Sequence, residues 1–197
     1  MKHIVVGALF VLGSLLAGKG SAATLGLTTG DPTVTASGAT VDYLEFVGGN
    51  LSTFAAIDTT SGISLGAFPQ LSFGVGFDLL DPTTGLSGGF GINDVSGQVL
   101  TGDLIAVGFT DSVIELQFGN LMGSAVGDFG ASVLATVSFS DALGPNPFSS
   151  LVNFTRYGAS ITIANVQSDP ISPIPLPAGI WLLLAGIFSL GWARRAS

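Results

Sequence analysis

The sequence predicts an all-β protein. We expect an antiparallel β-sandwich of the jelly-roll or immunoglobulin-like kind, flanked by an N-terminal signal helix and a C-terminal transmembrane helix. Three observations lead to this prediction. Apolar and polar residues alternate through the middle of the chain, turn-forming residues interrupt that alternation at short intervals, and both ends of the chain carry an uncharged apolar run next to basic residues.

The alternation has the period of two that a half-buried strand requires. It is clearest over residues 71–77, 113–118, 133–139 and 160–164 and weaker over 32–37, 41–46, 51–57 and 100–109. No window of 12 residues in this part shows a helical stripe. We therefore expect eight to ten strands. Packed sheets are the first choice for their arrangement, and a single barrel is the alternative.

Turn residues separate the expected strands. Pairs or clusters of Gly, Asn, Asp and Pro occur at 31–32, 48–50, 81–85, 93–94, 119–120 and 144–147. The glycine cluster at residues 88–91 is expected to be another turn, because no lysine or helix follows it as a phosphate-binding loop would require.

The N-terminus has the three parts of a secretory signal peptide. A basic start with Lys2 precedes an apolar run over residues 4–17, and small residues follow. Cleavage after Ala23 places Ser21 and Ala23 at the two positions that require small side chains. Cleavage after Ala22 is the alternative, and a retained N-terminal anchor is the competing interpretation.

The C-terminus predicts a second membrane segment. Residues 176–193 contain no charge and, as an α-helix, would span about 27 Å, close to the hydrocarbon core of a bilayer. Trp181 and Trp192 lie near its ends, where indole rings favour the interface. Arg194 and Arg195 follow as a stop-transfer signal, so that both ends satisfy the positive-inside rule.

Charge and composition exclude several classes of function. Residues 24–177 hold thirteen acidic side chains and one basic side chain, Arg156, for a net charge of −12. Such a surface repels phosphate backbones, so we expect no binding to nucleic acid. The same residues contain no His, Cys or Lys, which excludes His-based triads, thiol and lysine nucleophiles, and most zinc sites. We expect no catalytic residues and therefore no enzyme.

Two kinds of acidic site remain open. A carboxylate pair, Asp42 with Glu45 or Asp111 with Glu115, is the arrangement that glycoside hydrolysis uses. A structural calcium ion is the other possibility, since this ion prefers clustered carboxylates. We expect no cofactor beyond that possibility, and its weak candidates are Asp78, Asp81, Asp94 and Asp103. For Arg156 we expect a surface ion pair.

The C-terminal segment resembles a known sorting signal. Ile174, Pro175, Leu176, Pro177 and Ala178, then the apolar span, then two arginines, are similar in order to the VPLPA-CTERM branch of the PEP-CTERM family, with isoleucine in place of the usual valine. The resemblance covers residues 173–197 alone. It implies a bacterial protein that is exported by the secretion machinery and recognised by an exosortase, a membrane-embedded protease.

Together with the N-terminal signal and the alternating middle part, the resemblance predicts five parts of the chain. They are a signal peptide (1–23), a β-domain (24–169), a proline-rich linker with the sorting motif (170–177), a transmembrane helix (178–193) and a basic cytoplasmic tail (194–197). It implies an inner-membrane precursor that is then delivered to the cell surface or the extracellular matrix, alongside exopolysaccharide. The alternatives are a carbohydrate-binding module, a weak carboxylate-pair hydrolase, and a single-pass protein that stays anchored.

Overall fold

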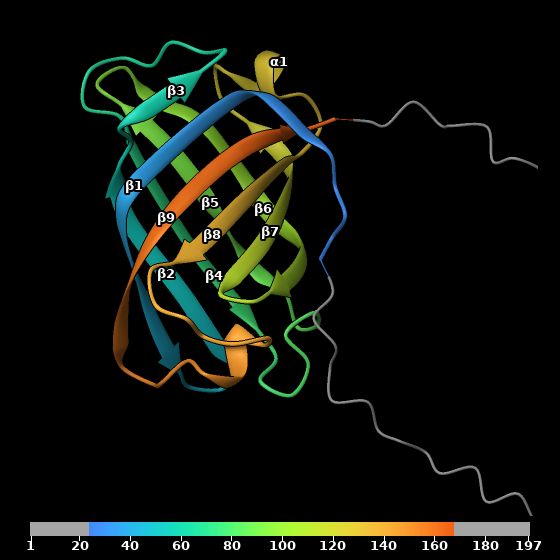
Figure 1. The fold of residues 1–197 in the computed structure, drawn as a ribbon. Coiled ribbons are helices and arrows are strands. Elements are labelled where there is room, and N and C mark those ends of the chain that lie inside the picture. The colour runs from blue at the N-terminus through green and yellow to red at the C-terminus, as the bar shows by residue number, and fades with distance from the viewer. Residues whose placement is uncertain (1–23, 168–197) are drawn as a thin grey trace, which may run out of the picture. The chain divides into compact units, whose positions relative to one another are not determined.

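The computed structural model describes residues 24–167. Within this range the chain forms nine strands, one short α-helix and one 3-10 turn (Figure 1). In chain order they are β1 (Thr29–Glu45), β2 (Gly49–Ala56), β3 (Thr59–Ser61), β4 (Gln70–Phe77), β5 (Ser87–Asp94), β6 (Gly97–Thr110), β7 (Val113–Met122), α1 (Val126–Phe129), β8 (Val133–Phe139), η1 (Pro147–Ser149) and β9 (Thr155–Val166). Between residues 24 and 167, no helix has the length and apolar character that crossing a bilayer requires.

The strands form one antiparallel barrel. From β4 to β9 each strand pairs with the next along the chain, and β2 pairs with β4. The long strand β1 closes the barrel, because Val41 pairs with Tyr157 of β9 on one edge and with Thr53 of β2 on the other. The short β3 extends the second edge, where Thr60 pairs with Val34.

The antiparallel all-β prediction is confirmed, but the two packed sheets of a sandwich are not. All nine strands belong to one sheet, and eight of them close it, which matches the barrel that the sequence left as the alternative. The alternation could not distinguish a sandwich from a barrel. It shows that each strand buries one face, but it does not show whether the two edge strands of the sheet pair with each other. The predicted terminal helices lie outside the described residues.

The inside of the barrel is filled by apolar side chains. In β4, the four inward residues Leu71, Phe73, Val75 and Phe77 are between 0 and 4% exposed, while the residues between them face outward. The same period occurs in β7, β8 and β9, as the sequence predicts for 113–118, 133–139 and 160–164. Burial of this apolar surface is the main stabilising contribution to the fold.

Each end of the barrel receives a phenylalanine from a short helical turn. Phe129 of α1 is fully buried and lies at the end where β5 turns into β6, which we call the α1 end. Phe148 of η1 lies at the opposite end, the η1 end (Figure 1). There its ring centroid is 4.7 Å from that of Phe77 and 5.4 Å from that of Phe109.

Several local predictions are wrong. The turns expected at 31–32 and 119–120 lie inside β1 and β7. Residues 32–37 and 41–46 belong largely to one strand, β1, which an irregularity in register between Ala36 and Ala39 interrupts without ending it. The glycine cluster at 88–91 is part of β5 and not a turn. A Cβ atom at Gly88 would lie 2.0 Å from the carbonyl oxygen of Gly74, so glycine allows the close approach of β4 and β5 here.

Candidate functional site

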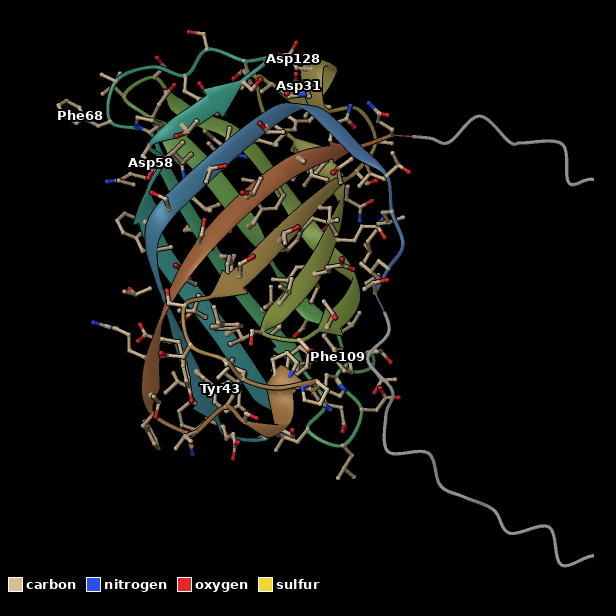
Figure 2. The ribbon with its side chains drawn as sticks, viewed as in Figure 1. Asp31, Tyr43, Asp58, Phe68, Phe109 and Asp128 are labelled. Atoms are coloured by element: carbon tan, nitrogen blue, oxygen red, sulfur yellow. The ribbon has the colours of Figure 1, made fainter. Side chains whose placement is uncertain are left out.

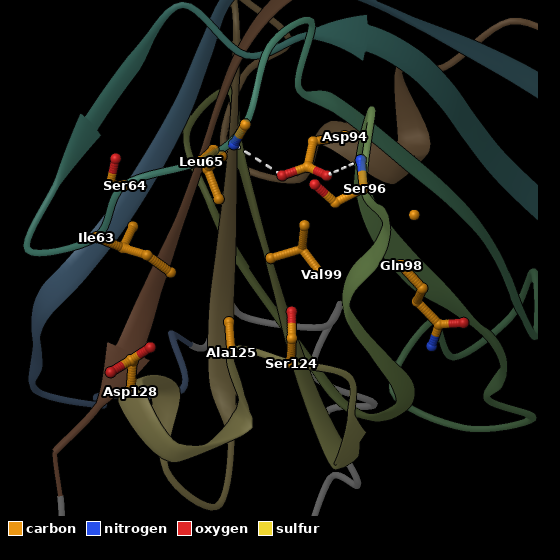
Figure 3. Close-up of a pocket in the computed structure, with 12 residues that line it drawn as sticks. Ile63, Ser64, Leu65, Asp94, Ser96, Gln98, Val99, Ser124, Ala125 and Asp128 are labelled. Carbon is orange, nitrogen blue, oxygen red and sulfur yellow. Dashed lines mark hydrogen bonds between the residues drawn. The ribbon is translucent and has the colours of Figure 1, made fainter.

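A hollow of about 480 Å³ opens at the α1 end (Figure 3). The loop after β3, the β5–β6 turn and the segment that leads into α1 surround it. Its lining combines apolar side chains with two carboxylates, and Figure 3 shows Asp94 and Asp128 at opposite sides of it. The two acids are therefore not arranged as a pair that shares one ligand atom.

Asp94 connects two of the segments around this hollow. Its Oδ2 atom accepts a hydrogen bond from the backbone N–H of Gly66, and its Oδ1 atom accepts one from the N–H of Ser96, each at 2.7 Å. These bonds, with that from Gly66 first, hold the pKa of Asp94 below its usual range. The ionised carboxylate thus joins the loop after β3 to the β5–β6 turn, and it is poorly suited to donate a proton.

A second hollow, of about 380 Å³, lies at the η1 end between the β1–β2 turn and the β4–β5 loop. Phe46 borders it and is 70% exposed, and its ring meets the ring of Phe154 edge-on at a centroid distance of 6.2 Å. Asn50 and Ser87 lie on either side of Gly76, where a Cβ atom would come within 2.7 Å of the Ser87 hydroxyl oxygen. The hollow is therefore bordered by an aromatic side chain, Phe46, and by the polar side chains of Asn50 and Ser87.

Two of the calcium candidates share one loop of the η1 end. Asp78 Oδ1 accepts a hydrogen bond from the N–H of Leu80 at 2.7 Å. Asp81 Oδ1 accepts one from the hydroxyl of Thr83 at 2.6 Å, and this bond holds the pKa of Asp81 below its usual range. Both carboxylates therefore stabilise turns of the β4–β5 loop (Figure 1).

The other two candidates are separated from this loop and from each other. Asp94 lies at the α1 end, whereas Asp103 on β6 pairs with Gly89, five residues before Asp94 on β5. That spacing corresponds to about 17 Å along the strand. Residues 24–167 contain no group of three or more His, Cys, Asp or Glu side chains that could hold a metal ion. The calcium site stays a prediction.

The possible carboxylate pairs are also divided by the fold. Asp42 and Glu45 are three residues apart on one strand and so face opposite sides of the sheet. Asp42 accepts two hydrogen bonds from Arg156, at 2.7 and 3.0 Å, and this guanidinium holds the pKa of Asp42 below its usual range. The surface ion pair expected for Arg156 is thereby confirmed.

In the second pair, Asp111 lies in the β6–β7 turn and Glu115 points outward from β7. Glu115 accepts a hydrogen bond from the backbone of Leu25. The remaining predicted site residues lie outside the described range and stay predictions. They are Ser21 and Ala23 of the signal, Ile174, Pro175, Leu176, Pro177 and Ala178 of the motif, and Arg194 and Arg195.

Comparison with family models, with curated proteins and with solved structures gives no match for this chain. The structure alone therefore describes the protein, as a closed antiparallel barrel with an interior filled by apolar side chains and a hollow at each end.

Sequence reasoning missed the aromatic pair of the η1 end. Phe46 lies two residues before Gly48 and Gly49, so a large apolar side chain near a turn could have been noticed. Phe154 lies more than a hundred residues later, and no local pattern connects the two. Both side chains stay largely exposed, so the η1 end carries an aromatic pair that is open to solvent.

Proposed function

We propose that this chain is an exported, non-enzymatic protein of the bacterial cell surface or extracellular matrix, sorted by an exosortase-type protease of the membrane. The observation that carries the proposal is the pair of terminal segments. A signal peptide occupies residues 1–23, and the Ile174–Ala178 motif, an apolar span and two arginines follow one another at the other end.

The limits of the barrel support this proposal. The first strand begins at Thr29 and the last ends at Val166. Cleavage after Ala23 leaves residues 24–28 before the barrel, and cleavage near the motif leaves residues 167–173 after it. Both cuts therefore fall outside every strand pair, so that a folded barrel can be processed at either end.

The environment of the acidic side chains supports a non-catalytic role. Ser37 donates hydrogen bonds from its backbone and its hydroxyl to Asp58, and these lower the pKa of Asp58. Asp81 and Asp94 have lowered pKa values for the same kind of reason. A general acid needs a pKa raised towards neutrality, whereas these three carboxylates act as ionised acceptors in turns.

Mass spectrometry of the two mature termini tests the proposal. Membrane and culture-supernatant fractions are analysed separately from cells that produce the full chain. We expect a start at Thr24 or Ala23 and a new C-terminus near residues 173–178. A Pro175→Ala, Pro177→Ala double variant should keep its complete tail, and Pro170→Ala, outside the motif, should be processed normally. A wild-type protein found only in the cytoplasmic membrane with its tail intact would show a permanent anchor instead.

We propose carbohydrate binding at the η1 end as a second candidate function. The exposed Phe46–Phe154 pair beside Asn50 and Ser87 favours it, because an aromatic face packs against the apolar face of a sugar while amide and hydroxyl groups bind its oxygens. The net charge of −12 over residues 24–177 disfavours acidic polymers, so a neutral polysaccharide is the expected ligand.

A glycan array tests this second candidate. Phe46→Ser and Phe154→Ser should each abolish binding that the wild type shows. Phe68→Ser is the matched control, because Phe68 is also highly exposed, at 83%, but lies at the α1 end (Figure 2). Equal binding by all three variants would place the ligand elsewhere, and hydrolysis of a bound glycan would indicate the hydrolase alternative.

A further inference from the structure

The first described residues lie alongside the barrel (Figure 1), and Leu25 forms a hydrogen bond to an acidic side chain of β7. The backbone N–H of Leu25 donates a hydrogen bond of 2.6 Å to Oε2 of Glu115 on β7, which is 90 residues further along the chain. Leu25 and Leu27 are both half-buried. A hydrogen bond to an ionised carboxylate is among the stronger kinds, so residues 24–28 are held to the barrel at this point.

No basic side chain is available to Glu115 in the part of the chain that the structure describes. Arg156 is the one Lys, Arg or His between residues 24 and 167, and Asp42 already binds it. The residues that pair with Glu115 on the neighbouring strands are Gly108 and Thr136, neither of which carries a charge. The nearest titratable residue along the sequence is the acidic Asp111.

We propose that Glu115 binds the α-ammonium group that signal cleavage creates at Thr24. This inference rests on the proposed export and on cleavage after Ala23. Hydrolysis of the Ala23–Thr24 peptide bond consumes one water molecule and yields the carboxylate of Ala23 and the ammonium of Thr24. The Cα atom of Thr24 is about 3.8 Å from that of Leu25, whose N–H already contacts Glu115.

The result is an ion pair that exists only in the processed protein. Before cleavage, the nitrogen of Thr24 is a neutral amide and offers Glu115 no charge. After cleavage, the new cation faces an uncompensated carboxylate on a strongly acidic molecule, and the pair fixes the mature N-terminus against β7. Cleavage after Ala22 would place the ammonium one residue further from Glu115, so the proposed ion pair requires cleavage after Ala23.

The chain offers a selective test because its only lysines, Lys2 and Lys19, precede the cleavage site. The α-amine is therefore the single amine of the processed protein, and its reaction with an acylating reagent such as acetic anhydride is followed on the N-terminal peptide by mass spectrometry. The exported protein is purified, its N-terminus is identified by mass spectrometry, and its rate of acylation is measured at about pH 7. An amine held as ammonium by a carboxylate reacts slowly, because only the neutral form is nucleophilic.

We expect Glu115→Gln to react about two to five times faster than the wild type, as an ion pair of this exposed kind would produce. Asp111→Asn is the matched control, because it removes a nearby charge from the β6–β7 turn and should react at the wild-type rate. Salt provides a second measurement that needs no variant. At about 1 M salt, where the screening length falls to about 3 Å, the wild-type rate should approach that of Glu115→Gln.

The outcomes separate this inference from the proposed function. Equal rates for wild type and Glu115→Gln, in protein that begins at Thr24, would overturn the ion pair and leave export standing. A mature protein that begins at another residue near the end of the signal would also overturn the ion pair and leave export standing. A start at Met1 would overturn both, because neither export processing nor the ammonium at Thr24 would exist.

Discussion

The two ends of the barrel are closed by different kinds of interaction. At the α1 end, Asp94 and Asp58 accept hydrogen bonds from backbone groups of neighbouring segments. At the η1 end, Phe148 packs against Phe77 and Phe109, and the ring of Tyr43 stacks on Phe77 at 6.4 Å. Both ends therefore bury a phenylalanine, and the α1 end adds hydrogen bonds to carboxylates where the η1 end adds further aromatic packing.

The outer surfaces of the two ends differ in how many large apolar side chains they expose. Most of the large apolar side chains that stay exposed belong to three loops of the η1 end, whereas the α1 end exposes two. Those of the η1 end are Phe46, Val47, Leu79, Leu80, Val152 and Phe154, and those of the α1 end are Phe68 and Val95. The comparison teaches that the η1 end exposes more apolar surface, and that at the α1 end the carboxylate of Asp94 joins two segments, so that its protonation should weaken their contact.

The largest expected effect comes from the buried phenylalanine of the α1 end. Phe129→Ala should lower the free energy of unfolding by about 3–5 kcal/mol, because it leaves a cavity where a fully buried ring stood. Denaturant unfolding measures the loss. Phe68→Ala at the same end, where the ring is exposed, should change stability little. A loss below about 1 kcal/mol for Phe129→Ala would mean that α1 does not belong to the core.

Removal of the corresponding ring at the η1 end should cost somewhat less. Phe148 is 9% exposed and lies at the rim, so Phe148→Ala should lower the free energy of unfolding by about 3 kcal/mol, and Phe148→Leu by a smaller amount. The measurement is again denaturant unfolding, read by the near-ultraviolet signal of the aromatic cluster. If the alanine variant proved as stable as the wild type, the aromatic packing would not close this end.

The third prediction concerns the pH dependence of stability, which a change at Asp94 of the α1 end should alter and a change at Phe148 of the η1 end should not. The pKa of Asp94 is lower in the folded barrel than in the unfolded chain, so its contribution is present above about pH 4 and is lost as the pH falls through the folded value. Wild-type stability should therefore decrease on acidification, and Asp94→Asn should show a shallower decrease. Phe148→Leu should keep the wild-type slope, and a matching change in that variant would contradict the comparison.

The smallest effect is expected at the wall of the barrel, where Asp42 pairs with Arg156. Both side chains are substantially exposed, at 39 and 67%, so solvent screens their attraction. Asp42→Asn should lower the melting temperature slightly at low salt and not at all at about 1 M salt. Arg156→Gln should behave in the same way, and a double variant no worse than either single one would show that the pair acts as a unit.

Part of the fold follows from local sequence alone. The period of two in residues 71–77, 113–118, 133–139 and 160–164 identifies both the strands and their buried faces, because each strand places alternate side chains on opposite sides. The absence of His, Cys and Lys from residues 24–177, and the confinement of nearly all basic residues to the two ends, are likewise properties of composition. They define what chemistry the chain can carry before any fold is known.

The candidate sites were much less predictable. Asp94 and Asp103 lie on the two strands of one hairpin, but the register places Asp103 opposite Gly89 and keeps the two acids apart. Conversely, the glycines at 88–91 indicate a turn in isolation, but in the fold they pair with β4 on one side and, from Gly89 on, with β6 on the other. Local patterns cannot contain such information, since it depends on which strand lies next to which.

By itself the sequence determined most of the strands and the faces they bury, though not β3 or β5, and the sorting signals that we expect at the two ends. Only the tertiary structure decided that the sheet closes into a barrel, that Phe46 meets Phe154, and that Leu25 reaches Glu115. The physical reason is the range of the interactions. Alternation and turn chemistry act between neighbouring residues, whereas closure and the contacts at the ends join residues that lie far apart along the chain.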